Sequence, residues 1–100
     1  MPTAETRVAT DRASRYLVQL CEHLNQLSAG HRGPGVRSVE WTESHGVVTL
    51  DFGRCELDAD DEGLVVRVVA DDARLLTHFE AELAARIETI GRRDGLVVEW

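Results

Sequence analysis

The chain has 100 residues, of which 43% are hydrophobic and 29% are charged, as expected for one folded domain with its own core. Eighteen acidic residues against eleven basic ones give a formal net charge of −7. Nucleic acids and anionic membrane surfaces attract positive charge, so this balance argues against both as partners. All eleven basic residues are arginine, which we interpret as coding bias rather than as phosphate recognition.

The cysteine content and the N-terminus bear on the cellular compartment. Cys21 and Cys55 are the two cysteines, too few for the disulfide framework of a small secreted domain. The N-terminal residues contain no apolar signal sequence, and no apolar run reaches the length of a membrane span. We therefore expect a cytoplasmic protein with reduced thiols and no membrane partner.

The first third of the chain predicts a strand and a helix. We expect a disordered tail at residues 1–4, a short strand at 6–10, and a helix at 11–27 that begins at Thr10 or Asp11. At 100° per residue, the apolar stripe of this helix spans about 80° of arc. Its members are Ala13, Leu17, Leu20, Leu24 and Leu27. Three glycines and a proline then predict a flexible loop at 28–35.

Four strand-like runs, a second helix and a last strand follow. Alternating apolar residues predict strands at 36–43, 47–52, 54–59 and 64–70. The 3.6-residue period of Leu76, Phe79, Leu83 and Ile87 predicts a helix at 72–90 that is capped by Asp71 or Asp72 and ends at Gly91. Leu96, Val98 and Trp100 alternate and predict a final strand.

The predicted order is β-α-β-β-β-β-α-β within a single domain, residues 1–100. Such an order favours an α+β two-layer sandwich, with a mostly antiparallel sheet and two helices on one face. It resembles the single repeat of the TATA-box-binding-protein-like fold with one extra strand, and a likeness of topology does not indicate function.

Several blocks of the sequence resemble a known family. These are residues 7–10, residues 14–23 (Ser-Arg-Tyr-Leu-Val-Gln-Leu-Cys-Glu-His), residues 53–59, and Arg92-Arg93-Asp94 with Trp100. Together they resemble the bacterial domain-of-unknown-function 2218 family nearly end to end. That family has no assigned activity, and resembling domains occur fused to siderophore-interacting flavoproteins. The resemblance implies a context of iron use and a flavoprotein reductase as a partner.

The chain departs from that family pattern at one point. Relatives often carry a second histidine three residues after the one that corresponds to His23, where this chain has Gln26. His31, in the glycine-rich loop, is the candidate replacement.

Cys21, His23 and Cys55 are the candidate metal ligands. Cys21 and His23 point about 160° apart on a helix, so they cannot hold one ion as an i, i+4 pair does. Cys21 and Cys55 could instead meet across the helix–sheet interface as a redox-sensitive pair or half a zinc site. The plainer alternative is two buried, inert thiols and a histidine at the core margin. We predict no other cofactor.

The sheet face away from the helices is the candidate contact surface. We expect it to carry Val47, Val65, Arg67, Val69 and Val97. Several valines on an uncovered face predict an interaction patch, and a homodimer could form there or at an edge strand. The alternative is a solvated face with scattered apolar residues.

No activated nucleophile or acid–base pair stands out in the sequence. We therefore favour a non-enzymatic accessory or interaction module in an iron- and siderophore-use context. The alternative is a small-ligand or metal-binding protein that uses His23 with Cys21 or Cys55.

Overall fold

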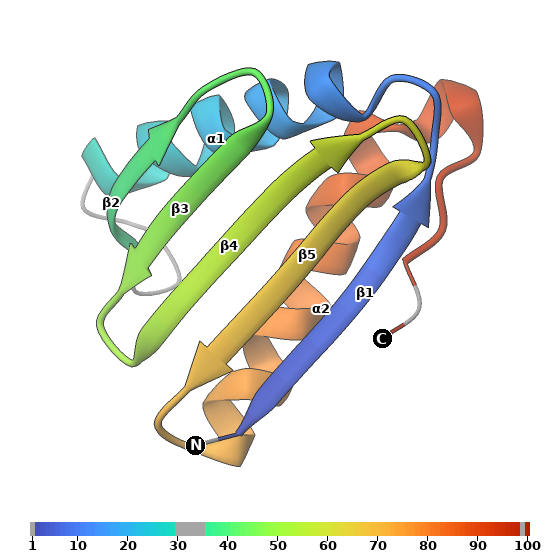
Figure 1. Cartoon of the computed structure of the whole chain (residues 1–100). Coiled ribbons are helices and arrows are strands. Elements are labelled where there is room, and N and C mark those ends of the chain that lie inside the picture. The colour runs from blue at the N-terminus through green and yellow to red at the C-terminus, as the bar shows by residue number, and fades with distance from the viewer. Residues whose placement is uncertain (1, 30–35, 99) are drawn as a thin grey trace.

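A five-stranded sheet and two long helices make up the computed structural model, which describes residues 2–29, 36–98 and 100 (Figure 1). The elements in chain order are β1 (Thr3–Ala9), α1 (Ala13–Ala29), β2 (Val36–Trp41), β3 (His45–Leu50), β4 (Gly53–Asp60), β5 (Gly63–Ala70), α2 (Ala73–Ile90) and a 3-10 helix, η1 (Arg92–Asp94). The predicted α+β sandwich is confirmed.

The strand order in the sheet is β1-β5-β4-β3-β2, and every neighbouring pair is antiparallel. Strands β2 to β5 pair with their neighbours in sequence, as successive hairpins do. Strand β1 instead pairs with β5 along its length, from Thr3 opposite Val69 to Ala9 opposite Gly63. The sheet edges are therefore β1 and β2.

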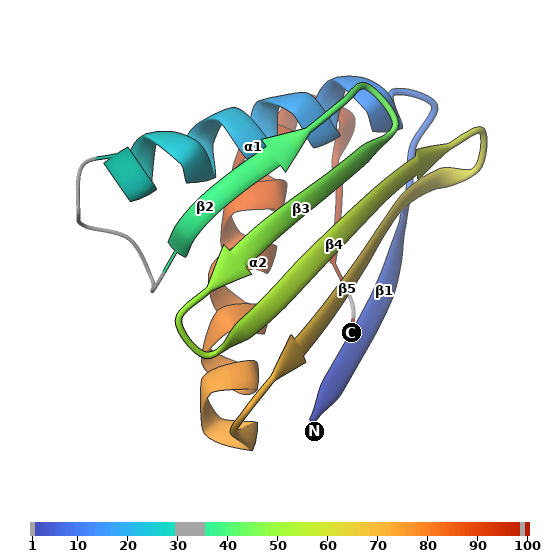
Figure 2. The ribbon, with the colours of Figure 1, turned by 60° about the vertical axis from the view of Figure 1, so that its left-hand side comes forward.

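Both helices cover the same face of the sheet (Figures 1 and 2). The core between the layers is apolar, because the alternating residues of each strand that face the helices meet the apolar stripes of α1 and α2. The largest buried helix residues are at most 2% exposed, and they are Leu17, Leu20, Leu24, Phe79, Leu83 and Ile87. Neither of the two described helices covers the opposite face of the sheet.

Helix α2 begins and ends where the sequence predicts. Asp72 Oδ1 accepts hydrogen bonds from the backbone nitrogens of Arg74 (2.7 Å) and Leu75 (3.3 Å), so it caps the helix. Gly91 follows the last turn, and a Cβ there would lie 2.3 Å from Leu96 Cδ1. Only glycine therefore lets Leu96 fold back against the end of α2.

The strand predicted at 96–100 is wrong, because none forms in the described part of that segment, residues 96–98 and 100. Leu96 and Val98 are buried, but they lie beside α2. The backbone nitrogen of Val98 donates to Glu88 Oε2 (3.1 Å), and Trp100 Nε1 donates to the carbonyl of Glu80 (3.1 Å). The backbone of Val98 is thus paired with a side chain instead of a neighbouring strand.

Two predicted boundaries also change. Thr3 and Ala4 belong to β1 and not to a tail, because β5 is long enough to pair with them. The helix α1 extends to Ala29, so it takes up the first residues of the predicted loop, whose remainder at 30–35 lies outside the described residues. Within the described residues, no helix has the length and hydrophobicity needed to cross a membrane.

Candidate functional site

Cys21 and Cys55 lie in the core between α1 and the sheet, with no exposed surface. Cys21 sits directly over Gly46, where a Cβ would be 2.9 Å from its Sγ. Burial raises the pKa of Cys21 to about 12. Burial, and then the nearby Cys21, raise the pKa of Cys55 still further. Protonated thiols are poor nucleophiles and poor metal ligands, so the geometry favours the interpretation of inert core residues.

His23 lies on the exposed side of α1, away from both cysteines. Its neighbours across the surface are Ala85, Arg86, Thr89 and Ile90 of α2. Among the residues that the structure describes, no three His, Cys, Asp or Glu side chains come together as metal ligands would. The other histidine of interest, His31, lies outside the described residues.

The uncovered sheet face carries charged side chains of both signs among its valines. Val47, Val65 and Val69 are half-buried on this face, and Arg67 lies between Glu5 and Glu56 on the neighbouring strands. Further charged residues flank the valines, and these are Arg7, Glu40, Arg54 and Asp58. Val97 is 63% exposed on the C-terminal segment beside α2, so it does not belong to this face. The valines thus do not form a continuous apolar patch.

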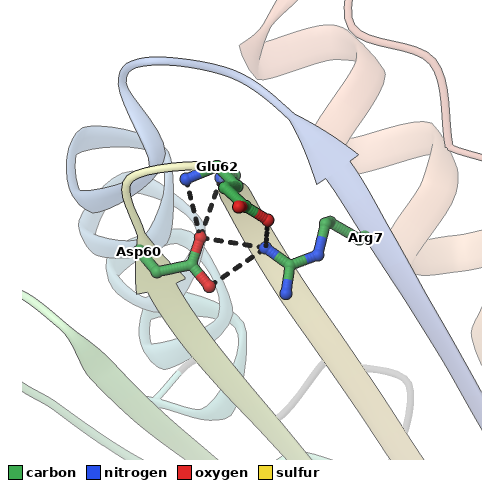
Figure 3. Close-up of polar contacts among 4 residues, drawn as sticks. Arg7, Asp60 and Glu62 are labelled. Carbon is green, nitrogen blue, oxygen red and sulfur yellow. Dashed lines mark hydrogen bonds and ion pairs between the residues drawn. The ribbon is translucent and has the colours of Figure 1, made fainter.

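At one end of this face, Arg7 joins β1 to the turn between β4 and β5 (Figure 3). Arg7 Nη1 donates to both carboxylate oxygens of Asp60 (2.9 and 3.0 Å) and lies 3.6 Å from Glu62 Oε2. Asp60 Oδ1 also accepts the backbone N–H groups of Glu62 (2.9 Å) and Gly63 (3.0 Å). These hydrogen bonds lower the pKa of Asp60, and the bond from the Glu62 N–H has the largest effect. The cluster is internally satisfied and suits a structural clamp.

The start of α1 breaks a local rule of helix electrostatics. Arg12 directly precedes the helix, and its carbonyl accepts the first helical bond, from the nitrogen of Tyr16 (3.1 Å). Arg15 lies in the first turn, which contains no acidic residue. Cations at the positive end of a helix dipole are destabilising. Proteins often break such a local rule at a functional site.

The 3-10 helix η1 brings a third arginine to the same place. The Tyr16 hydroxyl donates a hydrogen bond to Asp94 Oδ2. This bond is the main reason why the pKa of Tyr16 is raised. Arg12 Nη1 lies 3.9 Å from the same carboxylate oxygen. Around these groups is a cavity of about 270 Å³. Its lining residues are Arg12, Arg15, Tyr16, Gln19, Ile90, Arg93 and Asp94.

The charge in this cavity opposes that of the whole chain. Among the described residues, three arginines and one carboxylate line it, whereas the chain has a formal net charge of −7. Guanidinium groups form paired, charge-assisted hydrogen bonds with carboxylates and phosphates. The cavity can therefore hold an anionic group.

A second cavity adjoins the first. It measures about 300 Å³, lies between α1 and α2, and is lined by His23, Ala85, Arg86, Thr89 and Ile90. Ile90 lines both cavities. We call the two together the α1–α2 groove.

The C-terminal end of α2 lies close to α1, and its N-terminal end lies far from it (Figures 1 and 2). The α1–α2 groove therefore occupies the corner where the helices approach each other.

Residues 5–100 match the model of a protein family, domain of unknown function 2218, which is described as an uncharacterized protein conserved in bacteria. The chain belongs to this family. Membership confirms the resemblance found in the sequence, and the description of the family names no activity. A search of the curated proteins found no match.

The NMR structure of PA4090 from Pseudomonas aeruginosa is similar, with a TM-score of 0.73 and 25% sequence identity. The similarity covers 100% of this chain and 95% of that one. The fold described above is therefore shared with an experimental structure.

The sequence interpretation missed the arginines of the groove. Their number was interpreted as coding bias rather than as a sign of anion recognition. Two of the blocks that resemble the family, residues 14–23 and 92–94, meet at the bond between Tyr16 and Asp94. The sequence signal that could have pointed to a site is the pair of arginines, Arg12 and Arg15, at the start of a helix whose first turn contains no acidic residue.

Proposed function

We propose that this member of the family is a non-enzymatic accessory module that binds an anionic small molecule through Arg12, Arg15 and Arg93. The observation that carries the proposal is that these three arginines line one cavity. Asp94 is the one carboxylate among the described residues that line the cavity, and it already accepts a hydrogen bond from Tyr16 and is 3.9 Å from Arg12. Arg15 and Arg93 are thus the groups best placed to receive a ligand.

The context of iron use is part of this proposal. The sequence resembles domains that are fused to siderophore-interacting flavoproteins, and chelators of ferric iron carry acidic oxygen atoms. An accessory module beside such a reductase would hold an anionic chelator or its iron complex. The flavoprotein partner is supported by that resemblance alone.

The alternative function inferred from the sequence is a small-ligand or metal-binding protein that uses His23 with Cys21 or Cys55. We retain small-ligand binding but assign it to the arginines. Metal binding by His23 with Cys21 or Cys55 would require a buried thiol to leave the core and lose its proton. The arginine cavity needs no such rearrangement.

The proposal is tested by calorimetric titration with inorganic phosphate and with citrate at low salt. Arg15→Gln and Arg93→Gln each remove a charged donor, so each should weaken binding about tenfold or more. Arg74→Gln is the matched control, because Arg74 is an exposed arginine near the far end of α2. Absence of binding in the parent protein, or an equal loss in Arg74→Gln, would contradict the proposal.

A further inference from the structure

We propose that the ligand of the α1–α2 groove is an elongated organic anion, with its acidic group at Arg12, Arg15 and Arg93 and an apolar body that crosses Ile90 toward His23 and Arg86. This inference rests on the proposed function and adds the shape and chemical class of the ligand.

The walls of the groove are continuous along both helices. On α1, Arg15, Gln19 and His23 are spaced four residues apart and so lie on one side of the helix. On α2, Arg86 and Ile90 have the same spacing, and Arg93 of η1 follows. A ligand anchored at the arginines can therefore extend along the groove without leaving it.

The middle of the groove is apolar. Ile90 is half-buried between the two cavities, and Ala85 adds a short apolar side chain. An inorganic anion would fill only the arginine end and leave this surface in water. Taken together, the two cavities, of about 270 and 300 Å³, have a volume in the range for small-molecule sites. The apolar middle and the basic end together fit a molecule that is acidic at one end and apolar in its body.

The far end of the groove has an unused donor. Arg86 Nη1 donates to Glu82 Oε2 at 2.6 Å, but Arg86 Nε is buried and has no hydrogen-bond partner among the described residues. Such a donor is costly to leave unpaired. A ligand oxygen that arrives at this end could pair with it after a small movement of the side chain. We therefore expect a second polar group on the ligand near His23 and Arg86.

The experiment compares straight-chain carboxylates of increasing length, from acetate to decanoate, by calorimetry and by NMR shift mapping on the full chain. Each methylene buried on Ile90 should strengthen binding by up to about fourfold. The gain should stop once the groove is filled, and the shifted resonances should extend from Arg15 to His23.

Thr89→Trp tests the path of the chain, because an indole there would fill the apolar cavity. It should abolish the gain with chain length and leave the affinity for acetate and inorganic phosphate unchanged. Thr77→Trp is the matched control. Thr77 and Thr89 are both exposed on α2, and each donates its hydroxyl hydrogen to the carbonyl four residues earlier.

The possible failures can be told apart. Binding of phosphate and acetate without any gain from chain length would overturn the elongated ligand and leave the proposed function standing. The elongated ligand would also be overturned, and the proposed function would stand, if Thr77→Trp had the same effect as Thr89→Trp or if only acidic peptides bound along the groove. Absence of binding by every anion would overturn the proposed function itself.

Discussion

The Tyr16 hydroxyl donates a hydrogen bond to the Asp94 carboxylate across 78 residues of sequence. This bond joins the first turn of α1 to η1, and it occupies the carboxylate of Asp94, which lines the cavity together with Arg12, Arg15 and Arg93. Asp94 therefore has less capacity to neutralise Arg15 and Arg93. The contact between Tyr16 and Asp94 therefore holds η1 against α1 and helps to keep the charge of the cavity positive.

The bond can be observed directly, because Tyr16 is the single tyrosine of the chain. The interaction with Asp94 raises the pKa of Tyr16 above 10.0. The phenolate absorbance should therefore appear at higher pH in the folded protein than in urea, and Asp94→Asn should lower its midpoint. The folded state holds this proton more tightly than the unfolded one, so stability should fall as pH rises above 10.0. An identical midpoint in Asp94→Asn would show that the charge of Asp94 does not act on Tyr16.

Asp60 should make part of the free energy of unfolding depend on pH in the acidic range. Its pKa is lowered from 3.8 by the N–H of Glu62 and then by Arg7. Its contribution is present above pH 3.8 and is lost as pH falls through the lower, folded-state pKa. Urea unfolding should therefore show a smaller loss on acidification for Asp60→Asn than for the parent protein. Asp61→Asn, on the same turn, is the control and should behave like the parent protein.

Neither cysteine should react while the protein is folded. Burial holds Cys21 and Cys55 in the protonated form, and the thiolate is the reactive species. Mass spectrometry after treatment with iodoacetamide should show no addition in buffer and two additions in denaturant. Rapid labelling of either residue in buffer would mean that α1 opens from the sheet.

Gly46→Ala should destabilise the fold by about 1–3 kcal/mol. The new Cβ would be 2.9 Å from Cys21 Sγ and 3.4 Å from Leu57 Cδ1. Removing the sulfur with Cys21→Ala should relieve most of this clash, so the double variant should lose less than the two single variants together. Urea unfolding of the four proteins measures the coupling. Strict additivity would contradict the contact.

The C-terminal segment should contribute to stability although it forms no strand in its described part. Leu96 is 8% exposed and packs against Gly91, so Leu96→Ala should cost about 2–4 kcal/mol. Val97→Ala is the control, since Val97 is 63% exposed and should change stability by less than about 0.5 kcal/mol. Thermal unfolding compares the two. Equal effects would mean that the segment does not pack on α2.

The sequence predicted the layers of this fold better than their boundaries. The helical period of Leu17, Leu20 and Leu24 specifies which side of α1 is buried, and the structure buries that side. At the C-terminus, the alternation of Leu96 and Val98 also predicted burial correctly. Alternation does not reveal what covers a residue, and here α2 covers this segment where a strand was expected.

The candidate site was harder to predict. The sequence drew attention to Cys21 and His23 because they are close in the chain, but a helix separates neighbours by about 100°. The groove instead joins Arg15 to Arg93, which are far apart in sequence and meet only when η1 folds back on α1. Such a meeting depends on tertiary structure, which composition and periodicity do not contain.

The position of β1 beside β5 has a consequence for the order of folding. The hairpins from β2 to β5 can form locally, as soon as each pair of strands has been synthesised. The strand β1 leaves the ribosome first and must wait for β5, because Thr3 lies opposite Val69. Long-range pairing of this kind is slow to form. We therefore expect β1 to join the sheet last, so a nascent chain that stops short of β5 would carry an unpaired strand exposed to aggregation.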